Sequence, residues 1–168
     1  MKSAAPAERP LTASEWKRVA VIAAGMMGHS YSIGSIFSYV GIMAVDLGWA
    51  DDADAAGFVA SLLSSALTVA RLPTASLWGH AAERYGTGRA LRASCAAMAL
   101  GNALFGLCTT LAAALLVRGV LLGACNGFVT LMSPMAAEAA GDARQADVMA
   151  KVFAAAGAMA LLLSLIHI

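Results

Sequence analysis

The chain has 168 residues and a net charge of +1, with 60% hydrophobic residues and only 12% charged residues. Soluble domains carry about twice that charged fraction. A single soluble core of this length could not remove so much apolar surface from water. An alanine-rich soluble bundle is the alternative, but it would place charges every few residues, and this chain has long runs with none. Composition therefore argues against a soluble domain, and the absence of a basic cluster gives no reason to expect nucleic-acid binding.

Residues 1–18 contain prolines and charges before any apolar run, which predicts a polar cytosolic tail rather than a signal peptide. Five apolar segments follow, at about residues 19–47, 57–79, 90–109, 111–132 and 148–163. Segments of about 20 residues can cross a hydrocarbon layer of about 30 Å at about 1.5 Å per residue. No segment alternates apolar and polar residues, so strands are not expected. The sequence predicts an all-α transmembrane bundle.

The last residues, Ser164-Leu-Ile-His-Ile168, end the chain inside an apolar segment without a polar flank. Residues 164–168 read like translated adapter sequence, and we expect them to be a non-native read-through tail. We expect residues 19–163 to be the N-terminal bundle of a truncated chain whose C-terminal half is missing. A genuine five-span protein is the alternative.

Lysine and arginine are distributed unevenly between the two sides of the predicted bundle. Of 11 such residues, nine lie in the N-terminal tail or near the links before the third and fifth segments. Arg71 and Arg118 lie inside segments, and the remaining two links contain none. The positive-inside rule then predicts a multi-pass membrane protein with a cytosolic N-terminus. The charge pattern does not distinguish the plasma membrane from the vacuolar membrane.

The link between the second and third segments, residues 79–89, combines glycines with opposite charges at a membrane boundary. The residues that we single out as a gating loop are Gly79, Glu83, Arg84, Gly86 and Arg89. Gly79 would let two helices approach closely, and Gly86 would permit a tight turn. The charges could make and break ion pairs as helix bundles rock, although the arginines alone could be topology anchors.

The fourth segment contains Arg118 and a series of glycines at every fourth position, Gly119, Gly123 and Gly127. Such a series forms a groove in which another helix can pack closely. A charge inside the membrane costs about 2.5 kcal/mol or more, so Arg118 should face a cavity or a partner. A structural arginine whose charge reaches the membrane surface is the alternative.

Polar residues also form faces on the first two segments. Arg71 continues a stripe of serine and threonine along the second segment, and His29 in the first could carry a proton. Hydrogen bonding between helices is the alternative explanation for both. The cavity and coupling candidates are Arg71, Arg118, His29, Ser32, Ser35, Tyr39 and Asn126. The three cysteines lack metal-ligand spacing, so neither a metal nor a cofactor is predicted.

Residues 79–89 resemble the G-x-x-x-D-R-x-G-R/K signature between the second and third helices of the major facilitator superfamily, with Glu83 at the aspartate position. Leu77-Trp78-Gly79, residues 123–127 and Glu138 are similar to its tetracycline-resistance-like and zinc-induced-facilitator-like branch. The resemblance implies the first four helices and part of the fifth of such a bundle. It also implies a secondary transporter that works by alternating access, exporting a small solute in exchange for protons.

The resemblance further assigns roles to single residues. Arg118 resembles a fourth-helix arginine implicated in proton coupling, which usually precedes a glycine by four residues, whereas five separate Arg118 from Gly123. Glu138 and Arg144 would pair with the gating loop to latch an inward gate. Gly157 aligns with the start of an antiporter signature and, with the fourth-segment glycines, is a predicted helix-packing position.

We compared the transporter hypothesis with two other classes of function. An intramembrane enzyme is not predicted, because the sequence contains no HExxH, no GxSxG and no paired intramembrane aspartates. A non-transporting membrane receptor or scaffold on the same fold is the alternative. The two are distinguished by whether polar helix faces converge on a solvent-accessible cavity, and by whether proteoliposomes move a solute.

Overall fold

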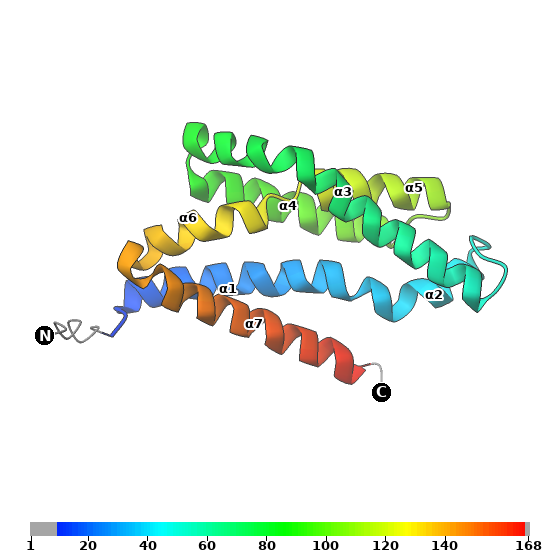
Figure 1. Cartoon of the computed structure of the whole chain (residues 1–168), viewed down its shortest axis with the longest axis horizontal. Helices are drawn as coiled ribbons and strands as arrows, with labels where there is room; N and C mark the ends of the chain where they lie inside the picture. Colours follow the sequence, from blue (N-terminus) through cyan, green and yellow to red (C-terminus); the bar gives the residue numbers. More distant parts are fainter. Residues whose placement is uncertain (1–9, 167–168) are drawn as a thin grey trace, which may run out of the picture.

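The computed structural model describes residues 10–166, which form helices packed lengthwise into an elongated bundle (Figure 1). In chain order the helices are α1 (Ala13–Gly34), α2 (Ile36–Asp46), α3 (Ala53–Tyr85), α4 (Thr87–Phe105), α5 (Leu111–Leu116), the π-helix η1 (Val117–Ala124), α6 (Phe128–Ala140), the 3₁₀-helix η2 (Asp142–Arg144) and α7 (Gln145–Ile166). Residues 10–166 contain no strand, so the predicted all-α fold is confirmed.

Local capping explains where several helices begin. Thr12 and Glu15 form a capping box ahead of α1. The Asp52 carboxylate accepts a hydrogen bond of 2.8 Å from the Ala55 backbone N–H at the start of α3. At the start of α5, the Thr110 hydroxyl accepts one of 3.3 Å from the Ala113 N–H. Each polar side chain satisfies a backbone donor that the first helical turn leaves unpaired.

Four helical stretches are long and apolar enough to cross a membrane, Ala13–Asp46, Ala53–Tyr85, Leu111–Ala140 and Asp142–Leu163. Each exceeds the length needed for a hydrocarbon layer of about 30 Å. The third predicted span, residues 90–109, corresponds to α4, which has 19 residues but is less apolar because Arg89 and Arg92 occupy its first turns. The chain is thus an integral, multi-pass membrane protein.

Several helix ends differ from the sequence-based ranges. α1 begins at Ala13, so the last part of the predicted N-terminal tail is helical. α3 continues to Tyr85, so most of the predicted link after residue 79 is helix. α7 extends through Ile166, into the predicted read-through tail. The rest of both predicted tails, residues 1–9 and 167–168, lies outside the described residues. The ends of the apolar runs therefore do not mark the ends of the helices, because a helix can continue past the membrane boundary.

The links between spans alternate between the two ends of the bundle (Figure 1). The start of α1, the α3–α4 turn and the α6–α7 link lie at one end, which we call the basic end because it contains Lys17, Arg18, Arg84, Arg89 and Arg144. The α2–α3 and α4–α5 links lie at the opposite end, together with the four aspartates of residues 46–54. The fold therefore separates the charges as the segment order predicts.

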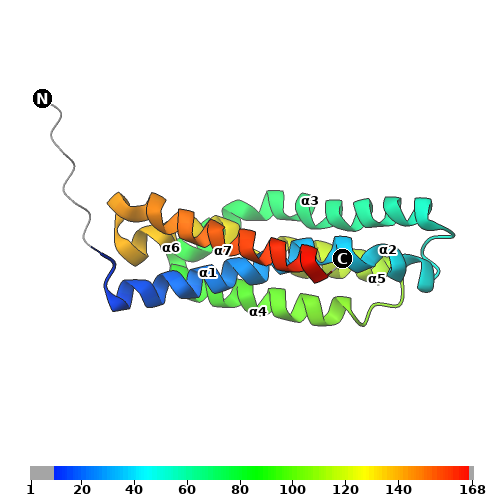
Figure 2. The ribbon, with the colours of Figure 1, turned by 90° about the horizontal axis from the view of Figure 1, so that it is seen from below.

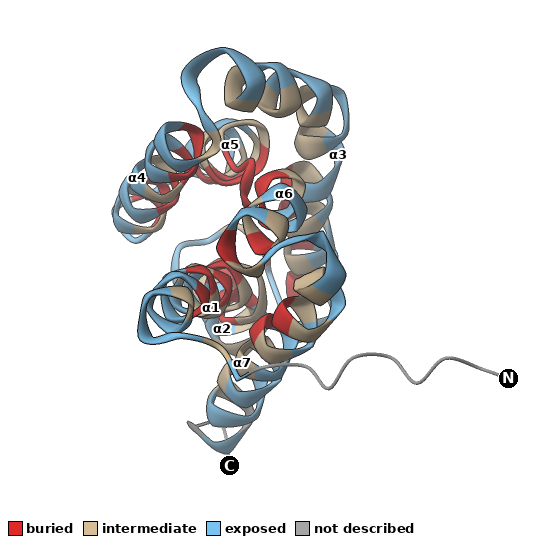
Figure 3. Ribbon diagram, turned by 90° about the vertical axis from the view of Figure 1, so that its left-hand side faces the viewer, coloured by how far each residue is buried: buried red, intermediate tan, exposed pale blue. Residues whose placement is uncertain are grey.

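The apolar core lies between the helices, and lipid-facing side chains lie outside it. α3 packs along η1 and α2, α1 packs along α7, and α4 contacts α3, η1 and α6. Figure 2 shows these helices lying lengthwise beside one another. Buried residues gather where the helices face one another, whereas the outer surfaces of α3 and α7 are partly or fully exposed (Figure 3). On α3, Phe58 and Leu72 are 70% and 73% exposed. Large apolar side chains on such outer surfaces suit a bilayer rather than water.

Candidate functional site

Arg118 lies in the interior of the bundle, where only 2% of its surface is exposed. Its Nη1 donates a hydrogen bond of 3.0 Å to the Ser32 carbonyl oxygen on α1. Its guanidinium carbon lies 5.4 Å from the centre of the Phe105 ring on α4. Both contacts offset part of the cost of a buried charge. The Arg118 Nε has no hydrogen-bond partner in the described part of the chain, so this arginine keeps an unused donor.

Ser32 connects α1 to α4 and belongs to helix packing. Its hydroxyl donates to the Gly28 carbonyl oxygen at 2.9 Å and accepts from Asn102 Nδ2 at 2.7 Å. Asn102 Nδ2 also donates to the Met98 carbonyl oxygen at 2.8 Å. Ser32 and Ser35 are both buried. The Ser32 hydroxyl thus takes part in a hydrogen bond between α1 and α4.

Tyr39 lies one helical turn after Ser35, and the two side chains interact. Its ring packs at a tilt against Phe105, with the centroids 6.5 Å apart. It also lines a cleft of about 440 Å³ near the acidic end of the bundle, together with Asp46 and Thr109. Neither Ser32 nor Ser35 lines this cleft, and a central cavity shared by the three residues stays a prediction. A shared helix face placed them together in the sequence, but α4 covers that face at Ser32.

His29, Arg71 and Asn126 come together from α1, α3 and the turn before α6, and we call them the inner polar cluster. His29 is 3% exposed, and Asn126 Nδ2 donates to its Nδ1 at 3.2 Å. The His29 ring stacks on Phe128, with the centroids 5.7 Å apart. Arg71 lies within electrostatic range of His29. Two Arg71 nitrogens, Nε and Nη2, are buried without a hydrogen-bond partner among residues 10–166.

The π-helix η1 explains how Arg118 reaches its position. Five residues separate Arg118 from Gly123, whereas the superfamily resemblance implies four. In a regular α-helix the additional residue would rotate Arg118 by about 100°. Residues 117–124 instead form wider turns, with a hydrogen bond of 2.8 Å from the Cys125 N–H to the Val120 carbonyl oxygen, five residues earlier. A π-turn holds one residue more than an α-turn, so it absorbs the additional residue and preserves the direction of Arg118.

Deleting Val120, which is 47% exposed, should convert this stretch to regular α-helix. We expect the Arg118–Ser32 contact to survive, and the free energy of unfolding in detergent to stay within about 1 kcal/mol of the parent, on the scale of one hydrogen bond. Deleting the buried Ala114 in the preceding α-helical turn is the matched control. It should cost roughly 3 kcal/mol or more, because it moves core residues out of register. Equal losses for the two deletions would contradict the register argument.

The stretch Leu111–Ala140, which comprises α5, η1 and α6, corresponds to the fourth predicted segment, and we call it the fourth span. Gly123 and Gly127 form its closest contacts with α3. A Cβ atom on Gly123 would lie 2.7 Å from the Leu67 carbonyl oxygen. A Cβ atom on Gly127 would overlap the Trp78 ring. The Trp78 Nε1 donates to the Ala124 carbonyl oxygen at 3.0 Å, which fixes that ring in place. The predicted packing groove is thus present at these two glycines.

The other predicted packing glycines behave differently. A Cβ atom on Gly119 would make ordinary contacts, 3.8 Å from the Ala66 carbonyl oxygen. A Cβ atom on Gly79 or Gly157 would meet no described atom within 4 Å. These two glycines therefore make no close helix contact within residues 10–166, and their packing roles stay predictions.

The gating loop is shorter than its sequence suggests. Most of its predicted residues are helical, with Gly79, Glu83 and Arg84 in α3 and Arg89 in α4. Gly86 makes the turn between the two helices with a φ of 88°, a conformation that strongly favours glycine. The Arg84 guanidinium lies over the ring of Tyr85.

The expected latch pairs do not form among the described residues. The Thr87 hydroxyl donates a hydrogen bond of 2.6 Å to the Glu138 carboxylate. Arg144 instead pairs with Asp147 at 3.5 Å, one helical turn further along the chain. Glu138 and Glu83 still border one cleft of about 700 Å³ at the basic end. The loop and α6 therefore meet as predicted, but through a hydroxyl rather than an ion pair.

Two residues near the inner polar cluster escaped the sequence analysis. Phe105 supplies the ring under Arg118, and the Ser94 hydroxyl accepts a hydrogen bond of 3.0 Å from the Gly127 backbone N–H. An aromatic or a serine within an apolar segment gives no sequence signal of such a role. Asn102 was not chosen as a site residue either, and its partner Ser32 is far away in the sequence.

Comparison with known proteins gives two relatives, both from Arabidopsis thaliana. The chain is 31% identical over 132 residues, 79% of its length, to the protein Zinc Induced Facilitator 1, and this match covers 27% of that protein. It is also 31% identical over 110 residues, 66% of its length, to a protein described as a probable peptide/nitrate transporter, of which it covers 22%. No family model and no solved structure matches the chain.

The chain spans about a quarter of the length of the relatives it matches. The helical bundle, with four stretches able to cross a membrane, defines a multi-pass membrane protein. The names of its relatives describe a facilitator and a probable transporter. The chain belongs to the major facilitator superfamily.

Proposed function

We propose that the chain is the first helical half of a secondary transporter, which exports a small solute by alternating access coupled to protons. The inner polar cluster is the observation that carries this proposal. Arg71 lies 14 residues before Tyr85 in α3, or about 21 Å at about 1.5 Å per residue. That depth is near the middle of a long span. Ionisable residues at such depth are costly and mark substrate or ion pathways.

Within the cluster, the side chains have different proposed roles, which follow from their chemistry. The two unpartnered Arg71 nitrogens suit an anionic group of the solute. His29 can take up and release a proton, and Asn126 orients its ring. Arg118 joins the fourth span to α1 through its hydrogen bond to Ser32. A movement of one span would therefore move the other.

The charge distribution supports a cytosolic position for the basic end, and hence for the N-terminus. The relatives support the zinc-induced-facilitator-like branch, and the name of the second relative makes peptides and nitrate the first solutes to test. The cleft between the gating loop and Glu138 would then lie at the cytosolic gate. Its single hydroxyl contact is weak enough to open during each cycle.

The test compares the 168-residue chain with the complete reading frame of its gene, each reconstituted in proteoliposomes that contain a pH-sensitive dye. We expect the complete protein to move protons when one of these solutes is added. The 168-residue chain alone should move neither, because a substrate path between two halves requires both. Solute-driven proton movement by the short chain would contradict the proposal.

A non-transporting receptor or scaffold is the second candidate. It is favoured by the burial of Ser32, Ser35 and Arg118 in helix packing, which needs no substrate path. A complete protein that inserts correctly and binds a solute, but moves neither solute nor protons, would establish this candidate instead.

A further inference from the structure

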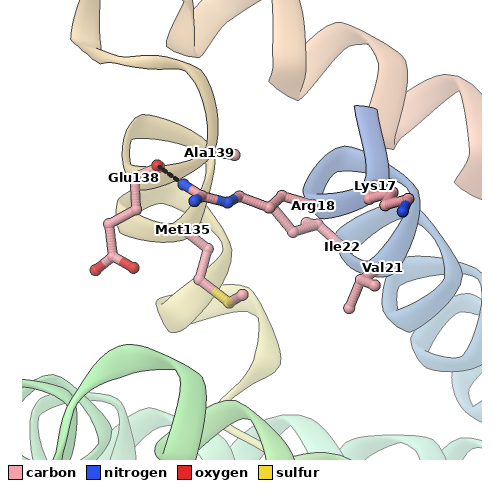
Figure 4. Close-up of a pocket in the computed structure, with 7 residues that line it drawn as sticks. All are labelled: Lys17, Arg18, Val21, Ile22, Met135, Glu138 and Ala139. Atoms are coloured by element: carbon pink, nitrogen blue, oxygen red, sulfur yellow. Dashed lines mark hydrogen bonds between the residues drawn. The ribbon is translucent and has the colours of Figure 1, made fainter. Parts of the chain in front are cut away.

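A cavity of about 350 Å³ lies at the basic end, between the first turns of α1 and the last turns of α6 (Figure 4). Ligand sites in proteins have volumes of about 300–1,000 Å³. Ile22 and Ala139, which are both buried, form its floor. Lys17 and Arg18 lie at its rim. No residue of the inner polar cluster or of the gating loop lines this cavity, although Glu138 borders both this cavity and the cleft beside the gating loop.

The rim of the cavity carries uncompensated positive charge. Arg18 Nη1 donates to the Glu138 carbonyl oxygen at 3.2 Å, which holds the guanidinium across the gap between the helices. The Glu138 carboxylate points away from α1 (Figure 4) and accepts from Thr87. Lys17 has no ion-pair partner within residues 10–166, whereas Lys151, on α7, pairs with Asp147. The rim therefore offers two cations and no facing carboxylate.

The wall below the rim is apolar. Val21 lies one helical turn beyond Lys17 and is 62% exposed. Met135 lies one turn deeper in α6 than Ala139 and faces the same cavity (Figure 4). Polarity thus changes from cationic to apolar in the direction that leads into the membrane span. A soluble anion would leave the exposed apolar wall without a partner.

We propose that this cavity binds an anionic phospholipid, with its phosphate between Lys17 and Arg18 and an acyl chain along Val21 and Met135. Charge complementarity at the rim selects an anionic head group, and the bilayer around the bundle supplies the ligand. Basic pockets between membrane helices are suited to such head groups. Lipid binding at this site does not depend on transport, so an experiment can contradict it without contradicting the proposed function.

Native mass spectrometry of the 168-residue chain in detergent tests this site, with dioleoyl phosphatidylglycerol and dioleoyl phosphatidylcholine as probes. We expect the chain to retain phosphatidylglycerol preferentially. Lys17→Gln or Arg18→Gln should each weaken phosphatidylglycerol binding roughly 5-fold, and the double variant about 30-fold. Arg92→Gln, which removes an exposed charge at the same end, is the matched control and should leave binding unchanged.

Additional experiments distinguish a bound phospholipid from other ligands of the cavity. Val21→Trp keeps both cations but places an indole in the cavity, so it should also displace the lipid, and it replaces an exposed side chain whose loss does not threaten folding. Inorganic phosphate or glycerol phosphate at the lipid concentration should not compete. Equal competition by these soluble anions, or an unchanged lipid count in both the double variant and Val21→Trp, would overturn the proposal. The proposal would also be overturned if these variants no longer changed lipid binding in the protein encoded by the complete reading frame, since another segment would then occupy the cavity.

Discussion

Gly123→Ala is expected to lower the free energy of unfolding of this chain by about 2–3 kcal/mol, the upper range for overpacking. The added Cβ would lie 2.7 Å from the Leu67 carbonyl oxygen and 3.0 Å from the Ala70 Cβ. Neither atom can rotate away, since one is backbone and the other is attached directly to it. α3 and the fourth span would have to separate, and close helix packing is a main source of association between membrane helices.

Two other glycines provide matched controls on the same scale. Gly119→Ala should be nearly neutral, because its Cβ would make only ordinary contacts. Gly79→Ala should be neutral or slightly stabilising, because the position is open and alanine favours helix more than glycine does. Thermal or denaturant unfolding in detergent measures all three. Similar losses at the three positions would show that the groove at Gly123 does not hold the spans together.

Arg118→Met is expected to abolish transport by the complete reading frame, while the 168-residue chain unfolds within about 1 kcal/mol of the parent. Methionine fills similar space without a charge. Replacing a buried charge by a well-packed apolar side chain is often neutral or stabilising, because the cost of removing the charge from water disappears. The loss of function would then follow from the charge itself and from its unused Nε donor.

The same experiment includes a charge control and a clear contrary result. Arg92→Gln removes an exposed arginine from α4 and should leave both stability and transport unchanged. Normal proton movement by Arg118→Met would show that this arginine has only a structural role. A large loss of stability would show that its bonds to Ser32 and Phe105 are worth more than the cost of burying the charge.

The sequence predicted the helical segments well because their signals are local. Long apolar runs indicate spans, and the lysine and arginine positions predicted which links share an end of the bundle. Helix ends were less accurate. The apolar run stops at Gly79, but the helix continues to Tyr85, since nothing before Gly86 interrupts its hydrogen bonds.

The candidate site was predicted only in part. His29, Arg71 and Asn126 were chosen separately as polar residues in apolar segments, and the structure brings them together. The partners of Glu138 and Arg144 were not predictable, because choosing Thr87 or Asp147 over Arg84 depends on helix positions that differ by a few ångströms. Every fourth-span glycine looked equivalent in the sequence, although they differ in their neighbours.

The sequence by itself determined that this protein lies in a bilayer, that it is built of apolar helices and how its charges divide between the two ends. These properties depend on composition and on short-range periodicity. Only the tertiary structure decided that η1 is a π-helix, that Arg118 faces Ser32, and that Gly123 and Gly127 are the tight contacts. These features depend on the exact rotation of helices packed against one another, and residues far apart in the chain set that rotation together.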